Sequence, residues 1–129
     1  MSKRISTDPA GKPLHRQPVP TVTQIGNLFF SSAIGGMDRQ TGEFPEDPET
    51  QIANAFDNMR ASLEAAGAGL EDVGKVTLFL RDRSMRDIVN RYWLEAFPDE
   101  HSRPVRHAAG APGAAEMIIQ LEFIAVKAD

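Results

Sequence analysis

The alternation of apolar and polar residues predicts a β-strand near the C-terminus, over residues 117–126. Successive side chains of a strand point to opposite faces of the sheet, so these residues divide into two sets. One set is apolar and is expected to face the core: Met117, Ile119, Leu121, Phe123 and Ala125. The other set places Gln120 and Glu122 between Ile118 and Ile124. Because an unpaired buried carboxylate is costly, this second face needs water, a partner subunit or a ligand.

Hydrophobic residues three or four positions apart predict an amphipathic helix in the middle of the chain. Asp47 is suited to cap its N-terminus, and Pro48 suits the first helical position. The helix is expected to end at Gly67, and its apolar stripe comprises Ile52, Phe56, Met59, Leu63 and Ala66. Residues 73–80 are rich in β-branched and large apolar side chains, and they predict a strand buried on both faces.

The same helical spacing recurs after this strand and predicts a second helix. Ser84 and Asp87 form a variant of the capping box at its start, and Pro98 stops it. Its apolar stripe comprises Ile88, Val89, Tyr92 and Ala96.

Two short apolar runs in the first quarter of the chain predict a β-hairpin. They cover residues 22–25 and 28–34, and the intervening Gly26-Asn27 suits the positive φ of a tight turn. Residues 1–21 contain four prolines, which favours an extended, loop-like arm over any regular element. Residues 38–47 have the composition of a turn-rich surface loop.

The predicted order is hairpin, helix, strand, helix, strand and strand, which favours an α+β fold in one domain over residues 1–129. Both helices would pack on a single face of one mixed β-sheet. The other face would expose an apolar patch of several hundred Å² in a monomer. We therefore expect an oligomer that covers this face, on which the sequence places Thr77, Phe79, Ile118 and Ile124.

The composition excludes several classes of function. The chain has no cysteine, which rules out disulfides, thiolate catalysis and metal sites with sulfur ligands. A formal net charge of -4 argues against nucleic acid as a partner. No apolar run approaches membrane-spanning length, and no apolar segment follows Lys3 and Arg4. We therefore expect a cytoplasmic protein with no membrane partner.

One local cluster of positive charge stands out in this acidic chain. It comprises Arg81, Arg83, Arg86 and Arg91. Acidic residues interleave with these arginines, namely Asp82, Asp87 and Glu95. We interpret the segment as a solvated helix surface with salt bridges.

Segments spread over nearly the whole chain resemble the RidA/YjgF family of small trimeric imine deaminases, once widely labelled as L-PSP endoribonucleases. Each segment alone is a weak signal, but their shared order is specific. They are residues 25–32 (Ile-Gly-Asn-Leu-Phe-Phe-Ser-Ser), 38–43, 63–73, 75–82, 89–90, 103–106 and 122–125. The resemblance implies a chorismate-mutase-like α+β subunit in a homotrimer with three pockets in the clefts between subunits. It also implies hydrolysis of reactive 2-imino acids to 2-oxo acids and ammonia, with no cofactor and no metal.

The resemblance also implies three pocket residues. Arg106 matches the arginine that binds the substrate carboxylate, while Ser32 and Asn90 match a serine and an asparagine that line the pocket. A guanidinium can hold a carboxylate through two parallel hydrogen bonds, which suits that role. The segment 103–107 and the Gly/Ala/Pro turn after it set this cation beside the strand 117–126. The alternatives are that Arg106 is a structural arginine at a subunit contact, that Asn90 is a surface residue, and that Ser32 bonds to backbone.

The chain departs from the family pattern at three positions. Gln120 stands where the archetypal deaminases have a glutamate that orients the attacking water. Glutamine can hydrogen-bond a water but cannot accept its proton, so we expect reduced activity or an altered substrate. A shift of register would let Glu122 or Glu116 take the carboxylate role. Val19 stands near a pocket-closing tyrosine of the family and His107 replaces a small residue, so the pocket would differ in shape and polarity.

The histidines offer little support for another enzyme class. His15, His101 and His107 have no metal-ligand spacing, and none forms a recognisable nucleophile–base pair in the sequence. His107 could act as a general base near the arginine, or it could be a sheet histidine that is hydrogen-bonded at the trimer contact.

Two hypotheses about function follow. The first is a homotrimeric enamine/imine deaminase for a small carboxylate-bearing substrate, in which Arg106 anchors the carboxylate and water held by Gln120 attacks the imine carbon. The second is a trimeric protein of the same fold that binds a small carboxylate, or regulates a partner, without catalysis. The replacement of glutamate by Gln120 motivates it. A ribonuclease would need a basic groove or paired histidines, which this acidic chain lacks.

Overall fold

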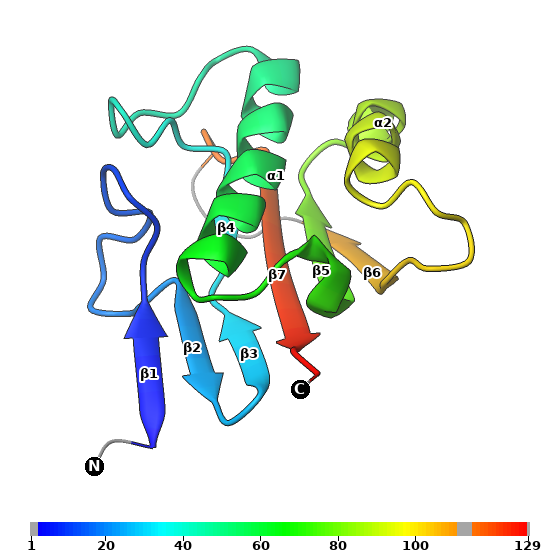
Figure 1. Ribbon diagram of the computed structural model, residues 1–129. Coiled ribbons are helices and arrows are strands. Elements are labelled where there is room, and N and C mark those ends of the chain that lie inside the picture. Colours follow the sequence, from blue (N-terminus) through cyan, green and yellow to red (C-terminus); the bar gives the residue numbers. More distant parts are fainter. Residues whose placement is uncertain (1–2, 111–114, 129) are drawn as a thin grey trace.

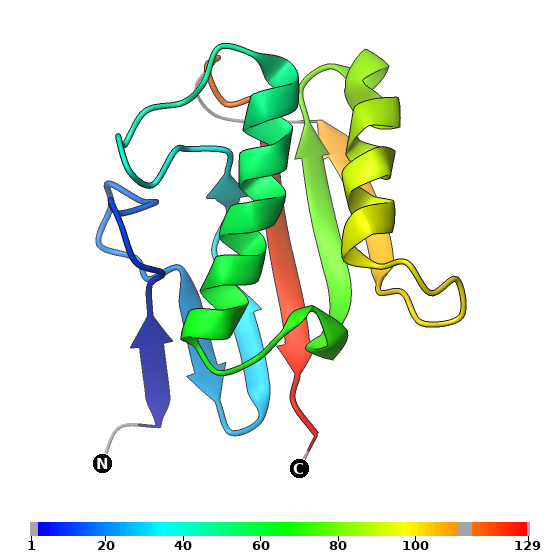
Figure 2. The ribbon, with the colours of Figure 1, turned by 45° about the horizontal axis from the view of Figure 1, so that its top comes forward.

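One mixed β-sheet with two helices on a single face forms the protein, as Figures 1 and 2 show. The computed structural model describes residues 3–110 and 115–128. Helices α1 (Pro48–Ala65) and α2 (Arg86–Ala96) lie side by side over the sheet, which confirms the expected α+β arrangement. The strands are β1 (Arg4–Thr7), β2 (Val22–Ile25), β3 (Leu28–Ser31), β4 (Ile34–Gly35), β5 (Val73–Leu80), β6 (Val105–Gly110) and β7 (Ile119–Val126).

The strand order places β6 at one edge of the described sheet. Along the sheet the order is β1-β2-β3-β7-β5-β6, and β4 also pairs with β7. Only β5 and β6 run parallel among these pairs, because the chain returns through α2 between them. β5 therefore separates β6 from β7, although β6 and β7 are neighbours in sequence. Residues 111–114, in the expected Gly/Ala/Pro turn between β6 and β7, lie outside the described residues.

The core lies between the sheet and the helices. Every second residue of β7, beginning at Ile119, is at most 2% exposed, as its alternating pattern predicts. From the other side, α1 contributes fully buried residues that include Ile52, Met59 and Leu63. The alternation then directs Gln120 and Glu122 to the face away from the helices.

The start of α1 follows the sequence prediction. The Asp47 carboxylate accepts a hydrogen bond from the backbone N–H of Thr50 at 3.0 Å, and Pro48 is the first helical residue. At the other end, Gly67 takes the positive φ (+89°) that a residue following a helix often needs.

The start of α2 differs from the prediction. The carboxylate of Asp82 accepts from the backbone N–H of Ser84 at 2.9 Å and begins a 3-10 turn, Arg83–Met85. The predicted capping box of Ser84 and Asp87 is wrong, because α2 begins only at Arg86 and no side chain caps it. The short-range bond to Asp82 satisfies the serine amide before the α-helical register starts. Figure 2 shows the turn at the end of α2 that follows β5.

The N-terminal arm contains a strand that its proline content argued against. β1 pairs antiparallel with β2 along all four of its residues. It lies before the first proline of the arm, Pro9, so every backbone N–H in it can donate. The Asp8 carboxylate then accepts from both the backbone N–H and the hydroxyl of Thr21, at 2.9 and 2.8 Å. The prediction of an arm without regular structure is therefore wrong for Arg4–Thr7.

The face of the sheet away from the helices remains partly apolar. Ile124 is 42% exposed, and its cross-strand neighbour Phe30 is also exposed. β5 is buried toward the helices, but Thr77 and Phe79 are only half-buried, so the expected burial of both faces is incomplete. Oligomerisation through this face stays a prediction. Over residues 3–110 and 115–128, no helix is long and apolar enough to cross a membrane.

Candidate functional site

Arg106 projects from β6 toward α2, where two side chains hold its guanidinium. Its Nη2 donates to Oδ1 of Asn90 at 2.9 Å. Its guanidinium carbon lies 4.9 Å from the centroid of the Trp93 ring, a distance at which cation and ring attract each other. The structure thus brings together two of the expected pocket residues, and it adds Trp93, to which no sequence motif pointed.

One end of this guanidinium has no partner. Nη1 of Arg106 is buried and makes no hydrogen bond to any part of the chain that the structure describes. Burial lowers the pKa of Arg106, and the nearby Arg86 cation lowers it further. Arginine nonetheless stays charged in proteins, so this half-buried guanidinium can bind an anion.

A cavity of about 300 Å³ adjoins Arg106 at the sheet edge. Its lining contains three arginines and no carboxylate, comprising Leu78, Leu80, Arg83, Arg86, Arg106, Ala108 and Ala109. The sequence interpretation of a salt-bridged surface holds for Arg91, which contacts Glu49 at 2.8 Å. Arg83 and Arg86 are exposed, as a solvated surface requires, but the expected salt bridges are wrong for them, because they form no ion pair with the described carboxylates.

The polar side chains of β7 lie on the other side of the sheet. Gln120 is only 8% exposed, and its Nε2 approaches Sδ of Met117 at 3.5 Å. Glu122 is half-buried and stands opposite Thr77 of β5, which in turn stands opposite His107 of β6. His107 and Glu122 therefore flank one threonine on the open face. Two strand spacings separate their backbones, which is about 10 Å.

Ser32 contacts a histidine of the N-terminal arm. Its Oγ lies 2.6 Å from Nε2 of His15, and its backbone N–H donates to the carbonyl of Thr21 at 3.0 Å. Burial lowers the pKa of His15, and the charge of Asp8 partly opposes that shift. The sequence did not suggest this contact between a histidine and a hydroxyl. No local signal could reveal a contact between residues 17 positions apart. Val19 is 46% exposed and lines a shallow groove with His15.

Comparison with known proteins decides the family. The family model described as Endoribonuclease L-PSP matches residues 13–127. The chain belongs to the RidA/YjgF family. The 2-iminobutanoate/2-iminopropanoate deaminase of Escherichia coli K12 is 33% identical over 130 residues, covering 98% of this chain and 99% of that protein. A RutC family protein of Pyrococcus abyssi is 34% identical over 125 residues, covering 95% of each. The crystal structure of the YjgF gene product of Escherichia coli superimposes with a TM-score of 0.85 at 26% identity, covering 96% and 99%.

In this RidA/YjgF chain the expected site residues divide between two faces of the sheet. Arg106 and Asn90 lie on the helix side at the β6 edge, whereas Gln120 lies on the opposite face of β7. The expectation that Arg106 sits beside the C-terminal strand is wrong, because β5 intervenes. A single subunit therefore does not bring the carboxylate anchor to the residue expected to hold the water.

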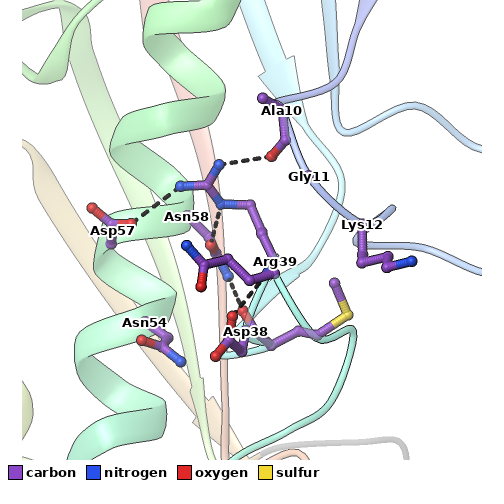
Figure 3. A pocket seen from close by; sticks show the side chains of 10 residues that line it. Ala10, Gly11, Lys12, Asp38, Arg39, Asn54, Asp57 and Asn58 are labelled. Atoms are coloured by element: carbon purple, nitrogen blue, oxygen red, sulfur yellow. Dashed lines mark hydrogen bonds and ion pairs between the residues drawn. The ribbon is translucent and has the colours of Figure 1, made fainter.

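A second cavity, of about 760 Å³, lies between the arm and α1 (Figure 3). Figure 3 shows Arg39 at its centre, where Nε donates to Asn58 at 2.8 Å and Nη1 donates to the carbonyl of Ala10 at 2.8 Å. Nη2 contacts the Asp57 carboxylate at 3.2 Å, so this arginine ties the arm to α1. Asp38 also lines the cavity, but residues 3–110 and 115–128 hold no three His, Asp or Glu side chains grouped for a metal ion.

Proposed function

We propose that the protein is an enamine/imine deaminase that hydrolyses reactive 2-imino acids to 2-oxo acids and ammonia. The observation that carries this proposal is the guanidinium of Arg106, which Asn90 holds beside an open cavity lined by this arginine. The similarity to a protein named 2-iminobutanoate/2-iminopropanoate deaminase over nearly the full length supports it.

Arg106 would bind the substrate carboxylate and fix its orientation. Asn90 engages Nη2 and Trp93 packs on the guanidinium face, so the side chain is held before substrate arrives. A carboxylate in the cavity would supply the negative charge that this guanidinium lacks and could accept its hydrogen bonds. Such preorganisation lets binding energy go into orientation rather than into ordering a flexible side chain.

The reaction itself needs only water. The water oxygen forms a bond to the imine carbon, the C–N bond then breaks, and nitrogen leaves as ammonia with two protons that come from the water. Gln120 could position this water through its amide, but it cannot take up a proton. Glu122 and His107, on the same open face, are the described groups near it that can.

A site built in this way is completed between subunits. Because Arg106 and Gln120 face opposite sides of one sheet, the β6 edge of one subunit would have to meet the open face of another. The exposed apolar residues on both surfaces suit such a contact, since Val105 at the β6 edge is 65% exposed and Ile124 is 42% exposed. We therefore propose a homotrimer with its pockets in the clefts between subunits.

The test generates 2-imino acids in situ with an amino-acid oxidase and follows their loss in competition with a trapping amine. We expect the wild type to accelerate hydrolysis, and Arg106→Ala to lower kcat/KM about 10- to 150-fold, the loss of about 1.5–3 kcal/mol from one charged hydrogen bond. Arg106→Lys is the matched control, because it keeps the charge but not the planar fork. A wild type that does not exceed the buffer rate refutes the deaminase.

A second function, carboxylate binding without catalysis, is favoured by one observation. The amide of Gln120, which the resemblance aligns with a glutamate of the family, already contacts Met117. In that case, a 2-oxo acid would bind to the wild type and not to Arg106→Ala, yet no imine would be turned over. Gain of hydrolysis in Gln120→Glu would then identify the lost carboxylate as the cause.

A further inference from the structure

The arginine-lined cavity holds more positive charge than one carboxylate needs. Arg83, Arg86 and Arg106 all line its about 300 Å³, and no acidic side chain does. This concentration is not a general property of the chain, whose formal net charge is -4. The other arginines with described ion pairs, Arg39, Arg60 and Arg91, each contact a carboxylate. What sets these three arginines apart is that they share one cavity whose lining holds no carboxylate.

Local structure brings these charges together at an electrostatic cost. The 3-10 turn begun by Asp82 carries Arg83, and Arg86 is the first residue of α2. A cation is unfavourable at the N-terminus of a helix, where the backbone dipole favours negative charge. No side chain caps this end of α2. Arg86 also acts on Arg106 as a like charge. A bound anion would relieve all of these repulsions together.

We infer that the site takes a 2-imino acid with a second carboxylate on its side chain, which Arg83 and Arg86 bind while Arg106 holds the first. The inference rests on the proposed function only in taking Arg106 as the anchor for the carboxylate next to the imine. A small aliphatic side chain would leave two arginines unpaired against an apolar group, whereas a carboxylate pairs with both. The cavity volume is at the lower end of the range for small-molecule pockets, so it suits a short diacid.

The test compares two imino acids with the same five-carbon chain. 2-Iminoglutarate, formed from glutamate, carries the second carboxylate, and 2-iminopentanoate, formed from norvaline, lacks it. We expect wild-type kcat/KM to favour the diacid at least about 10-fold, and Arg83→Ala and Arg86→Ala each to lower that ratio about 3- to 10-fold at low salt. Arg91→Ala is the matched control, because it removes an arginine of the same helix that is paired to Glu49 and lies outside the cavity lining. Its ratio should equal the wild-type ratio.

A binding measurement separates this inference from the proposed function. Trp93 is the only tryptophan of the chain and lies against Arg106, so its fluorescence reports on the site. Glutarate and pentanoate are titrated into wild type and variants, with circular dichroism to verify folding. If neither imine is hydrolysed but glutarate binds more tightly in an Arg83- and Arg86-dependent way, the deaminase fails and the diacid site stands. The diacid site is refuted and the deaminase stands if 2-iminopentanoate is hydrolysed at least as well as 2-iminoglutarate. The same holds if the ratio of their kcat/KM values is unchanged in both Arg83→Ala and Arg86→Ala. Equal binding of both acids with no hydrolysis of either refutes both.

Discussion

Replacing Arg106 by methionine should lower kcat/KM about 10- to 150-fold, as expected for Arg106→Ala, with little effect on stability. Removing its hydrogen bond to Asn90 costs about 1.5–3 kcal/mol, and loss of the Trp93 contact costs about 0.5–1 kcal/mol. Removing a buried donor that has no partner returns about 1–3 kcal/mol. The substitution also removes the like charge beside Arg86 and adds an apolar side chain against Trp93. Both changes offset more of the lost stability. We expect the free energy of unfolding of Arg106→Met to lie within about 1 kcal/mol of the wild type.

Urea unfolding at one fixed subunit concentration measures this difference, because the proposed assembly would make stability depend on concentration. If Arg106 instead paired an acid at a subunit contact, its loss would leave a buried carboxylate alone and destabilise the protein by about 3–5 kcal/mol. A loss of that size would refute the view that Arg106 is kept free for a ligand. Stabilisation of the folded protein by a bound ligand provides a second test. A 2-oxo acid at 100 times its Kd should stabilise the wild type by about 2.7 kcal/mol and should leave Arg106→Met unchanged.

Three further substitutions test other parts of the structure. Burial lowers the pKa of His15 below its unfolded value, so folding favours the neutral ring, and stability should fall as the pH drops from about 6.5 toward the lower folded pKa. Urea unfolding between pH 7 and 5 should show that the free energy of unfolding depends less steeply on pH in His15→Gln than in the wild type. An unchanged pH dependence would contradict the burial of His15. Asp47→Ala should cost about 0.5–2 kcal/mol in thermal or urea unfolding by removing the cap of α1, with no change in assembly. Ile124→Asp places a charge on the open face of the sheet and should shift sedimentation from trimer to monomer, whereas a trimer that persists would locate the contact elsewhere.

The elements predicted correctly are those whose signals are local. The cap at Asp47, the stripe of α1 and the alternation in β7 depend on neighbours within a few residues, and each agrees with the structure. Local signals in the sequence could not show that β5 separates β6 from β7, because strand order depends on how distant segments pack. Sequence proximity therefore suggested a shared face for Arg106 and Gln120 that the sheet does not provide.

Contacts between distant segments were the least visible in the sequence. His15 reaches Ser32 only because the arm folds back after β1, where Asp8 bonds to Thr21. The charges at Arg83 and Arg86 looked balanced, since acids alternate with them in the sequence. In the structure Asp82 is committed to the turn amide of Ser84. The acids are adjacent along the chain but are not ion-paired to these arginines in space.

The absence of described ion pairs at Arg83 and Arg86 bears on how the site can evolve. In this chain Arg106 at the sheet edge is held by Asn90 and Trp93, while the other charged residues of the cavity lining, Arg83 and Arg86, come from the turn before α2 and from its first residue. Side chains of that turn contribute little to the core, because Arg83 and Arg86 are exposed, so substitutions there cost little stability. They can nevertheless change the charge that faces a ligand by two units. Substrate choice can therefore change at Arg83 and Arg86 while the anchor, the fold and the proposed chemistry stay the same.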